Sequence, residues 1–261
     1  MKRLMFCLSL SFVLVSCAPA SADSSLPGAP SPFLAEPLQE IPAPPVLPQD
    51  YGIRLVPDST VSYAATRAAT ERLRSGLRRN TPSPDSLSRA FTDALLNGII
   101  PYWYGTPWSF GGHTSKPGVG QVACGYFVST TLAHLGLNVN RYRLAQRSPL
   151  REAQSLALGE EIIGVNESVT AAAIHQIDSL TSEGIYFIGF DQSHVGYLLK
   201  RGGELFVLHS DYTSAFGVRV EPIGESVAFG LFERFQLVPL SGNQILLQRW
   251  LSGAEVAVLA E

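Results

Sequence analysis

The clearest structural signal in this 261-residue chain is a β-hairpin in its C-terminal half. Residues 194–200 and 204–209 are mainly apolar segments of strand length, and they flank the tripeptide Arg201-Gly202-Gly203. Glycines in so short a connection are typical of the tight turns that join antiparallel strands. Further short strands are predicted at residues 185–190, 218–220 and 232–238. We therefore expect an antiparallel sheet in this part of the protein.

Helical patterns precede the sheet, so the predicted fold class is α+β, with helices packed on an antiparallel sheet. Apolar residues recur at helical spacing over residues 59–79, and Ser83-Pro84 supplies an N-cap and a first-turn proline for a second helix to about residue 97. These two helices are interpreted as scaffold, because burial explains their apolar stripes. A third helix is predicted over residues 124–135, before Gly136, and a closing helix over 244–259.

The N-terminus carries an export signal. Lys2 and Arg3 precede an apolar run over residues 4–15, which is too short to span a bilayer as a permanent helix. The tetrapeptide LVSC at residues 14–17 resembles the lipobox of bacterial lipoproteins, which implies cleavage before Cys17 and acylation of that residue. The alternative is a plain secretory signal that is cut near residues 18–22. Both predict export, and the lipobox predicts a lipid anchor on a bacterial membrane, facing the periplasm or cell exterior.

Residues 18–57 are dense in Pro, Ala and Ser and lack any helical or alternating apolar period, so a linker is predicted there. The folded domain is expected at residues 58–261, with a helical lead-in to residue 100, a core over 101–240 and a closing helix over 241–261. An apolar fraction of 46% suits a globular domain. The 19 basic residues are outnumbered by 22 acidic ones, so nucleic acid is not expected as a partner. The oligomeric state stays open.

Export leaves one cysteine without an assigned role. Cys7 lies in the signal and Cys17 is expected to be acylated, so Cys124 is the remaining thiol. A lone thiol in an oxidising compartment is a liability, which nucleophilic catalysis would explain; a buried inert cysteine is the alternative. Cys124 begins a predicted helix, whose N-terminus favours a thiolate and offers free N–H groups to an oxyanion. His194, on a predicted strand, is the candidate base.

Three segments around these residues carry a family resemblance. Residues 104–112 have the sequence YGTPWSFGG, residues 123–128 read ACGYFV, and residues 194–196 read HVG. Together they resemble the NlpC-type cell-wall peptidases. The family shows a Gly-x-Pro-aromatic segment, a Gly-Gly pair, an Asp-Cys-Ser-Gly helix start and a His-Val-Gly strand in this order. The resemblance covers roughly residues 104–209. It implies a papain-like fold and hydrolysis of peptide amides in peptidoglycan, without a metal or organic cofactor.

The chain departs from the family pattern at three positions. Ala123 replaces the usual Asp, Gly125 the usual Ser, and Trp108 a common tyrosine. Two other functions therefore stay open: a non-catalytic murein-binding or assembly lipoprotein with the same shell, and an acyltransferase that uses the same Cys/His pair with an amine acceptor. A serine triad of Ser193, His194 and Asp211 lacks the Gly-x-Ser-x-Gly elbow.

The third catalytic residue depends on the hairpin register. A turn at Arg201-Gly202 sets His194 opposite His209, whereas a turn at Gly202-Gly203 sets it opposite Asp211. Hairpin propensity favours Asp211, but the resemblance favours His209, which we predict, with Asp211 as the alternative. The substrate cleft is predicted to include Trp108, Gly112, His113 and Tyr126.

Overall fold

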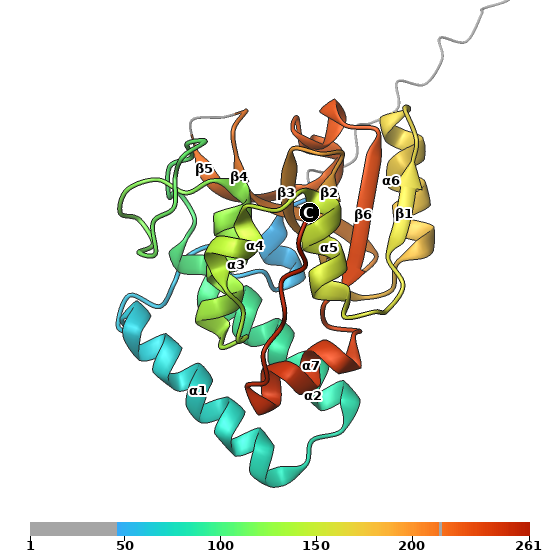
Figure 1. Ribbon diagram of the computed structural model, residues 1–261. Helices are drawn as coiled ribbons and strands as arrows, with labels where there is room; N and C mark the ends of the chain where they lie inside the picture. Colours follow the sequence, from blue (N-terminus) through green and yellow to red (C-terminus); the bar gives the residue numbers. More distant parts are fainter. Residues whose placement is uncertain (1–45, 214–215) are drawn as a thin grey trace, which may run out of the picture. The chain divides into compact units, whose positions relative to one another are not determined.

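The computed structural model describes residues 46–213 and 216–261. The predicted signal peptide, Cys17 and residues 18–45 of the predicted linker lie outside the described residues. The described part is α+β, as predicted, with a six-stranded antiparallel sheet in the order β1-β6-β2-β3-β4-β5 (Figure 1). The strands are β1 (Ile163–Asn166), β2 (Gly184–Phe190), β3 (His194–Arg201), β4 (Glu204–Asp211), β5 (Gly217–Pro222) and β6 (Arg234–Pro239). The α-helices are α1 (Tyr63–Asn80), α2 (Pro84–Asp93), α3 (Cys124–Leu135), α4 (Arg141–Ala145), α5 (Pro149–Ala157), α6 (Thr170–Leu180) and α7 (Gln244–Ser252).

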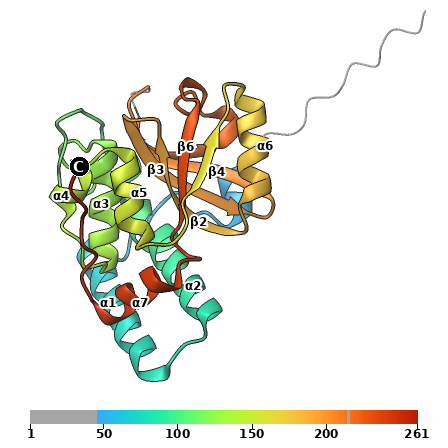
Figure 2. The ribbon, with the colours of Figure 1, turned by 45° about the vertical axis from the view of Figure 1, so that its right-hand side comes forward.

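Both faces of the sheet are covered. Helices α3 and α5 lie on one face and α6 on the other (Figure 2). Along β2, Ile185 and Phe187 belong to the core cluster shared with α3, whereas Tyr186 and Ile188 belong to the cluster under α6. A strand that buries both faces needs apolar residues at every position, which is why residues 185–190 read as a continuous apolar run.

Local capping sets the helix boundaries, and α1 begins at Tyr63 rather than at the predicted residue 59. The hydroxyl of Ser62 accepts from the amide of Ala65 at the start of α1, and Ser83 does the same for α2. Helix α3 spans Cys124–Leu135 as predicted, and Gly136 ends it in the left-handed conformation with φ 101°. Helix α2 runs on into a π-helical segment, Ala94–Ile99, and a 3-10 turn, Ile100–Tyr102.

The hairpin turn is Gly202-Gly203, with φ values of 62° and 80°. Arg201 pairs with Glu204, and the ladder extends to Tyr197 opposite Leu208. Positive φ at both central residues is the type I′ geometry that glycine adopts without strain. Both glycine amides also donate to the Glu183 carboxylate. Continuing the register by counting sets Gly196 opposite His209 and His194 opposite Asp211.

Several sequence expectations need correction. The fold begins before residue 58: Ile53 is only 2% exposed, and the ring of Tyr51 lies 5.2 Å from that of Phe206. The closing helix ends at Ser252 rather than at residue 259, because Gly253 turns the chain with φ 79°. Strand β1 was not predicted, because its four residues are too few to establish an alternating pattern.

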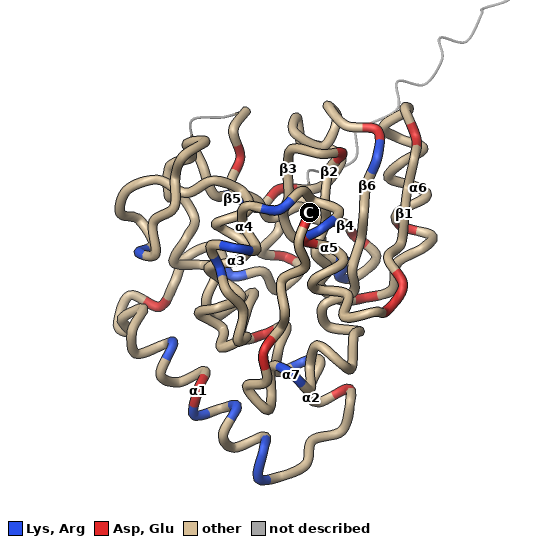
Figure 3. Tube along the Cα trace, viewed as in Figure 1, with Lys and Arg blue, Asp and Glu red and all other residues tan. Residues whose placement is uncertain are grey.

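The charged residues of the described part are dispersed along the chain trace, with the densest basic run on α1 (Figure 3). Its arginines, apart from Arg74, are exposed, whereas Arg74 is 5% exposed and donates to the Trp250 carbonyl at 2.8 Å. This bond ties α1 to α7. Within residues 46–213 and 216–261, no helix combines the length and apolarity needed to cross a bilayer.

Candidate active site

Cys124 is the first residue of α3 and lines a pocket between that helix and the start of β3. Its N-cap, Ala123, is extended and makes no side-chain cap. The backbone groups of Cys124 and Gly125 at this helix start instead hydrogen-bond the Cys124 thiol. The amide of Val195 donates to the thiol. Since Val195 follows His194 directly, this bond places the thiol against the strand that carries the candidate base.

His194 begins β3 and is 2% exposed. Its Nε2 lies 2.8 Å from Nδ1 of His209. The ring of Phe232 stacks parallel to the imidazole at 6.2 Å, and Phe190 and Tyr212 pack at 5.1 and 5.4 Å. These rings shield the imidazole from water. Because Nε2 faces His209, Nδ1 is the ring nitrogen that is not engaged with it. The two predicted histidines are therefore brought together.

Two residues that sequence reasoning missed continue this chain of contacts. Nε2 of His209 lies 3.1 Å from Oε1 of Glu221, and Oε2 of Glu221 forms an ion pair with Arg219. His209 is fully buried, and Glu221 is 4% exposed. Arg219 and Glu221 lie two residues apart on β5, among valines. This alternation of valine with a charged residue was the available signal, but it did not reveal which strand would pair with β4.

His194 and His209 share a hydrogen bond, and among the described residues none joins His194 to Asp211, although the hairpin has the Gly202-Gly203 register that would favour Asp211. The residue directly opposite His194 in the hairpin register is therefore not its hydrogen-bond partner. A Cβ on Gly196 would lie 3.0 Å from Cβ of His209, so the missing side chain lets His209 lean across the strand to its diagonal neighbour. Asp211 instead accepts from the amide and hydroxyl of Thr213, each at 2.7 Å, and meets Arg219 at 3.4 Å.

The pocket beside Cys124 measures ≈ 490 Å³. Trp108 and Tyr126 line it, as predicted, but Gly112 and His113 are not among its lining residues. Gly112 is packed against the chain at Val122, where a Cβ would lie 2.6 Å from the backbone nitrogen, and His113 is exposed with Nδ1 2.8 Å from the Gly111 carbonyl. Neither residue is therefore part of the cleft wall.

Glu152, on α5, lines the pocket next to Gly125. It is 2% exposed, its Oε2 has no hydrogen-bond partner among the described residues, and burial raises the pKa of the carboxyl well above its ordinary value. Burial therefore favours the uncharged form of this acid. It is a further residue that sequence reasoning did not single out, because its position in the first turn of a helix is explained equally well by the helix dipole.

Burial works against charge on both catalytic candidates. It raises the pKa of the Cys124 thiol to about 11, although backbone hydrogen bonds oppose this. Burial also lowers the pKa of His194 well below its ordinary value; His209 adds to the lowering and Asp211 opposes it. Burial therefore favours the neutral forms of both the thiol and the imidazole. The thiolate-favouring effect expected of the helix N-terminus is outweighed by desolvation.

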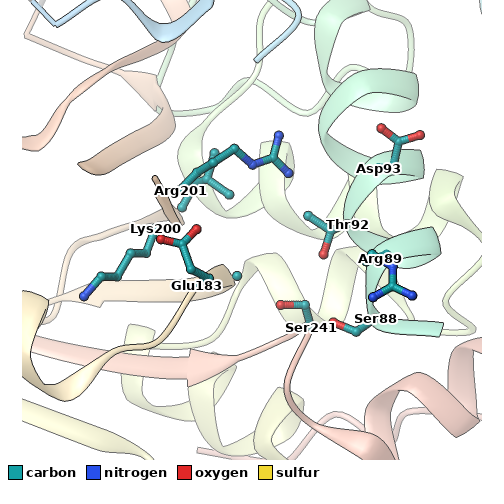
Figure 4. Close-up of a pocket in the computed structure, with 10 residues that line it drawn as sticks. Ser88, Arg89, Thr92, Asp93, Glu183, Lys200, Arg201 and Ser241 are labelled. Atoms are coloured by element: carbon teal, nitrogen blue, oxygen red, sulfur yellow. The ribbon is translucent and has the colours of Figure 1, made fainter. Parts of the chain in front are cut away.

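A second pocket of ≈ 320 Å³ lies between α2 and the adjoining ends of β2 and β3 (Figure 4). Its lining includes Ser88 and Ser241 but neither a cysteine nor a histidine. The Ser241 hydroxyl accepts from the amide of Ile185 at 3.0 Å, which is a structural bond. In the part of the chain that the structure describes, no cluster of three or more His, Cys, Asp or Glu residues is arranged to hold a metal ion. The chemistry therefore points to the Cys124 pocket.

Comparison with known proteins adds no assignment: no family model, curated protein or solved structure matches this chain. The class that the coordinates define is an α+β protein with an antiparallel sheet and a Cys/His pocket.

The space around Gly125 supports a prediction about the serine that the resembled family carries there. A Cβ at Gly125 would lie 2.9 Å from the Ala145 carbonyl oxygen and 3.1 Å from Oε1 of Glu152. Gly125→Ser should therefore lower the free energy of unfolding by about 1–3 kcal/mol, the usual cost of overpacking. Urea unfolding measures this, with Gly111→Ser as the control because nothing lies within 4 Å of its added Cβ. Equal midpoints for the two variants would contradict the packing argument.

Proposed function

We propose that this protein is a papain-like cysteine hydrolase of amide bonds that acts on peptidoglycan stem peptides. The observation that carries the proposal is the bond between Nε2 of His194 and Nδ1 of His209, next to a thiol at an uncapped helix start. A nucleophile, a base and a group that orients the base are the three parts that acyl transfer through a covalent intermediate requires. The peptide substrate is proposed from the resemblance and the export signal.

The proposed reaction uses only groups of the chain and water. Nδ1 of His194 takes the proton of Cys124 as the sulfur bonds to the amide carbonyl carbon, and the amides at the start of α3 face the oxyanion. The C–N bond then breaks, and the amine leaves with the proton from His194. Water adds to the thioester, gives its proton to His194, and releases the acid with the thiol restored. Opposite charges on sulfur and imidazole attract each other, which lowers the cost of forming this pair in a buried site.

Digestion of purified peptidoglycan, followed by mass spectrometry of the fragments, tests the function. We expect new amino and carboxyl ends from the wild-type protein and none from Cys124→Ala. Hydroxylamine should release a hydroxamate from the trapped thioester. Transfer to an added amine without hydrolysis would identify an acyltransferase, and retention on peptidoglycan without any fragment would identify a binding protein; both results would replace the proposed hydrolase.

We also propose that the protein is exported and held on a bacterial membrane through Cys17, which lies outside the described residues. Cys17→Ser should abolish incorporation of labelled fatty acid and move the protein from the membrane fraction to the soluble one. Two or more acyl chains anchor a protein stably, whereas a single chain binds only marginally. A wild-type protein that incorporates no label would contradict the proposal, and Cys7→Ser is the matched control because the signal containing Cys7 is removed.

A further inference from the structure

We propose that Glu221 sets the tautomer of both buried histidines and thereby makes Nδ1 of His194 the atom that accepts the thiol proton. The catalytic meaning rests on the proposed function, but the tautomers themselves are a property of the resting protein. Glu221 contacts neither the pocket nor Cys124 in the described structure, so it is a positioning residue that acts through His209.

Glu221 contacts His209 directly. A carboxylate has no hydrogen to donate, so at 3.1 Å from Oε1 the Nε2 atom of His209 must carry the hydrogen. In a neutral imidazole one nitrogen donates and the other accepts. Nδ1 of His209 is therefore left with a lone pair, which points at His194.

The tautomer of His209 in turn determines which ring nitrogen of His194 carries the hydrogen. Its Nε2 lies 2.8 Å from Nδ1 of His209, so it must be the donor of that bond. Burial keeps the imidazole of His194 neutral by lowering its pKa. Its Nδ1 is then unprotonated and free to act as a base, which is the form that the proposed chemistry needs.

Arg219 holds the Glu221 carboxylate in place. Its Oε2 is paired with Arg219, a side chain that can only donate, and Arg219 also reaches Asp211 at 3.4 Å. The charged and titratable groups around the histidine pair are thus Asp211, Arg219 and Glu221, with Cys124 and Tyr212 on the side of the pocket. Arg219 fixes which carboxylate oxygen faces His209.

The variant Glu221→Gln tests this arrangement. The side-chain amide has the shape of the carboxylate, but an NH₂ donor replaces one of its two acceptor oxygens. Arg219 can only donate, so the amide oxygen must face Arg219 and the NH₂ group must face His209. His209 would then have to accept at Nε2 and carry its hydrogen on Nδ1. That hydrogen would be donated to Nε2 of His194, which leaves the hydrogen of His194 on Nδ1, where it blocks the base.

Nitrogen-15 NMR of the full-length protein reads these tautomers directly, since protonated and unprotonated ring nitrogens differ widely in chemical shift. The spectrum is recorded near pH 8, above the ordinary histidine pKa of about 6.5. The wild type should show His194 and His209 both protonated on Nε2 alone, and Glu221→Gln should show both on Nδ1 alone. Glu225→Gln changes an exposed acid four residues further along the chain and should leave the wild-type pattern.

A wild-type spectrum with hydrogen on Nδ1 of His194, or on both nitrogens of His209, overturns the proposal, and so does an unchanged pattern in a folded Glu221→Gln. If Glu221→Gln does not fold, the wild-type spectrum alone decides. Peptidoglycan hydrolysis should fall about 10²- to 10⁴-fold in Glu221→Gln, the usual contribution of a general base. Expected tautomers without any hydrolysis by the wild type would refute the proposed function and leave the role of Glu221 standing.

Discussion

Cys124 should react with iodoacetamide at neutral pH about 20-fold more slowly than a free cysteine. Its pKa of about 11 lies about 2.5 units above the free value of about 8.5, which means about 300-fold less thiolate. A thiolate of higher pKa is the stronger nucleophile, with a Brønsted coefficient of about 0.4–0.5, which restores about 10- to 18-fold. The rate should then rise about tenfold per pH unit and level off only near pH 11. Measured rates between neutral and alkaline pH, with a small thiol as reference, test this.

A raised thiol pKa means that the reactive form is scarce below it, so reactivity grows as pH rises through it. The contrary result is a fast rate at neutral pH that disappears in His194→Ala. It would show that attraction within a thiolate–imidazolium pair outweighs desolvation in the resting site. A fast rate that persists in His194→Ala would instead assign the reactivity to the helix N-terminus and the backbone hydrogen bonds.

His194→Ala should reduce amide hydrolysis about 10²- to 10⁴-fold, which is the usual contribution of a general base. His209→Ala should have a smaller effect, because it removes the group that orients the base. Loss of a buried hydrogen-bond partner costs about 1–3 kcal/mol, equivalent to about 5- to 150-fold in rate. Asp211→Asn should have the smallest effect of the three, since its carboxylate bonds Thr213 and Arg219 rather than the imidazole.

Fragment yields from peptidoglycan, compared at equal protein concentration, measure this order. Thermal unfolding must accompany them, because removing His209 leaves the buried Glu221 with one partner fewer. A large defect in folded Asp211→Asn with near-normal His209→Ala would reverse the assignment of the third residue. Similar rates for His209→Ala and wild type would reduce the site to a Cys/His dyad.

Gly196 shows why the third residue could not be derived from the hairpin register. Counting from the Gly202-Gly203 turn gives the observed pairing, yet the partner of His194 is the diagonal His209. The decisive fact is the absence of a Cβ at Gly196, whose virtual position lies 3.0 Å from Cβ of His209. The sequence contains this glycine, but only the folded structure shows that the His209 side chain occupies the space left by its missing Cβ.

The sequence alone determined the local features of this protein. Serine caps and the glycine after residue 135 place the helix ends, the two glycines place the hairpin turn, and apolar runs place most strands. These features depend on neighbouring residues, so they can be recognised without the fold. The same holds for Cys124 at a helix start and for the histidine that opens a strand.

The tertiary structure decided what depends on distant segments. Glu221 is twelve residues from His209 and meets it because β5 pairs with β4, and Glu152 reaches the nucleophile from another helix. Burial then reversed the electrostatic expectation for Cys124, since the cost of removing a thiolate from water exceeds what the helix N-terminus and backbone amides supply. The desolvation of a group depends on all the segments packed around it, so a local sequence pattern does not reveal it.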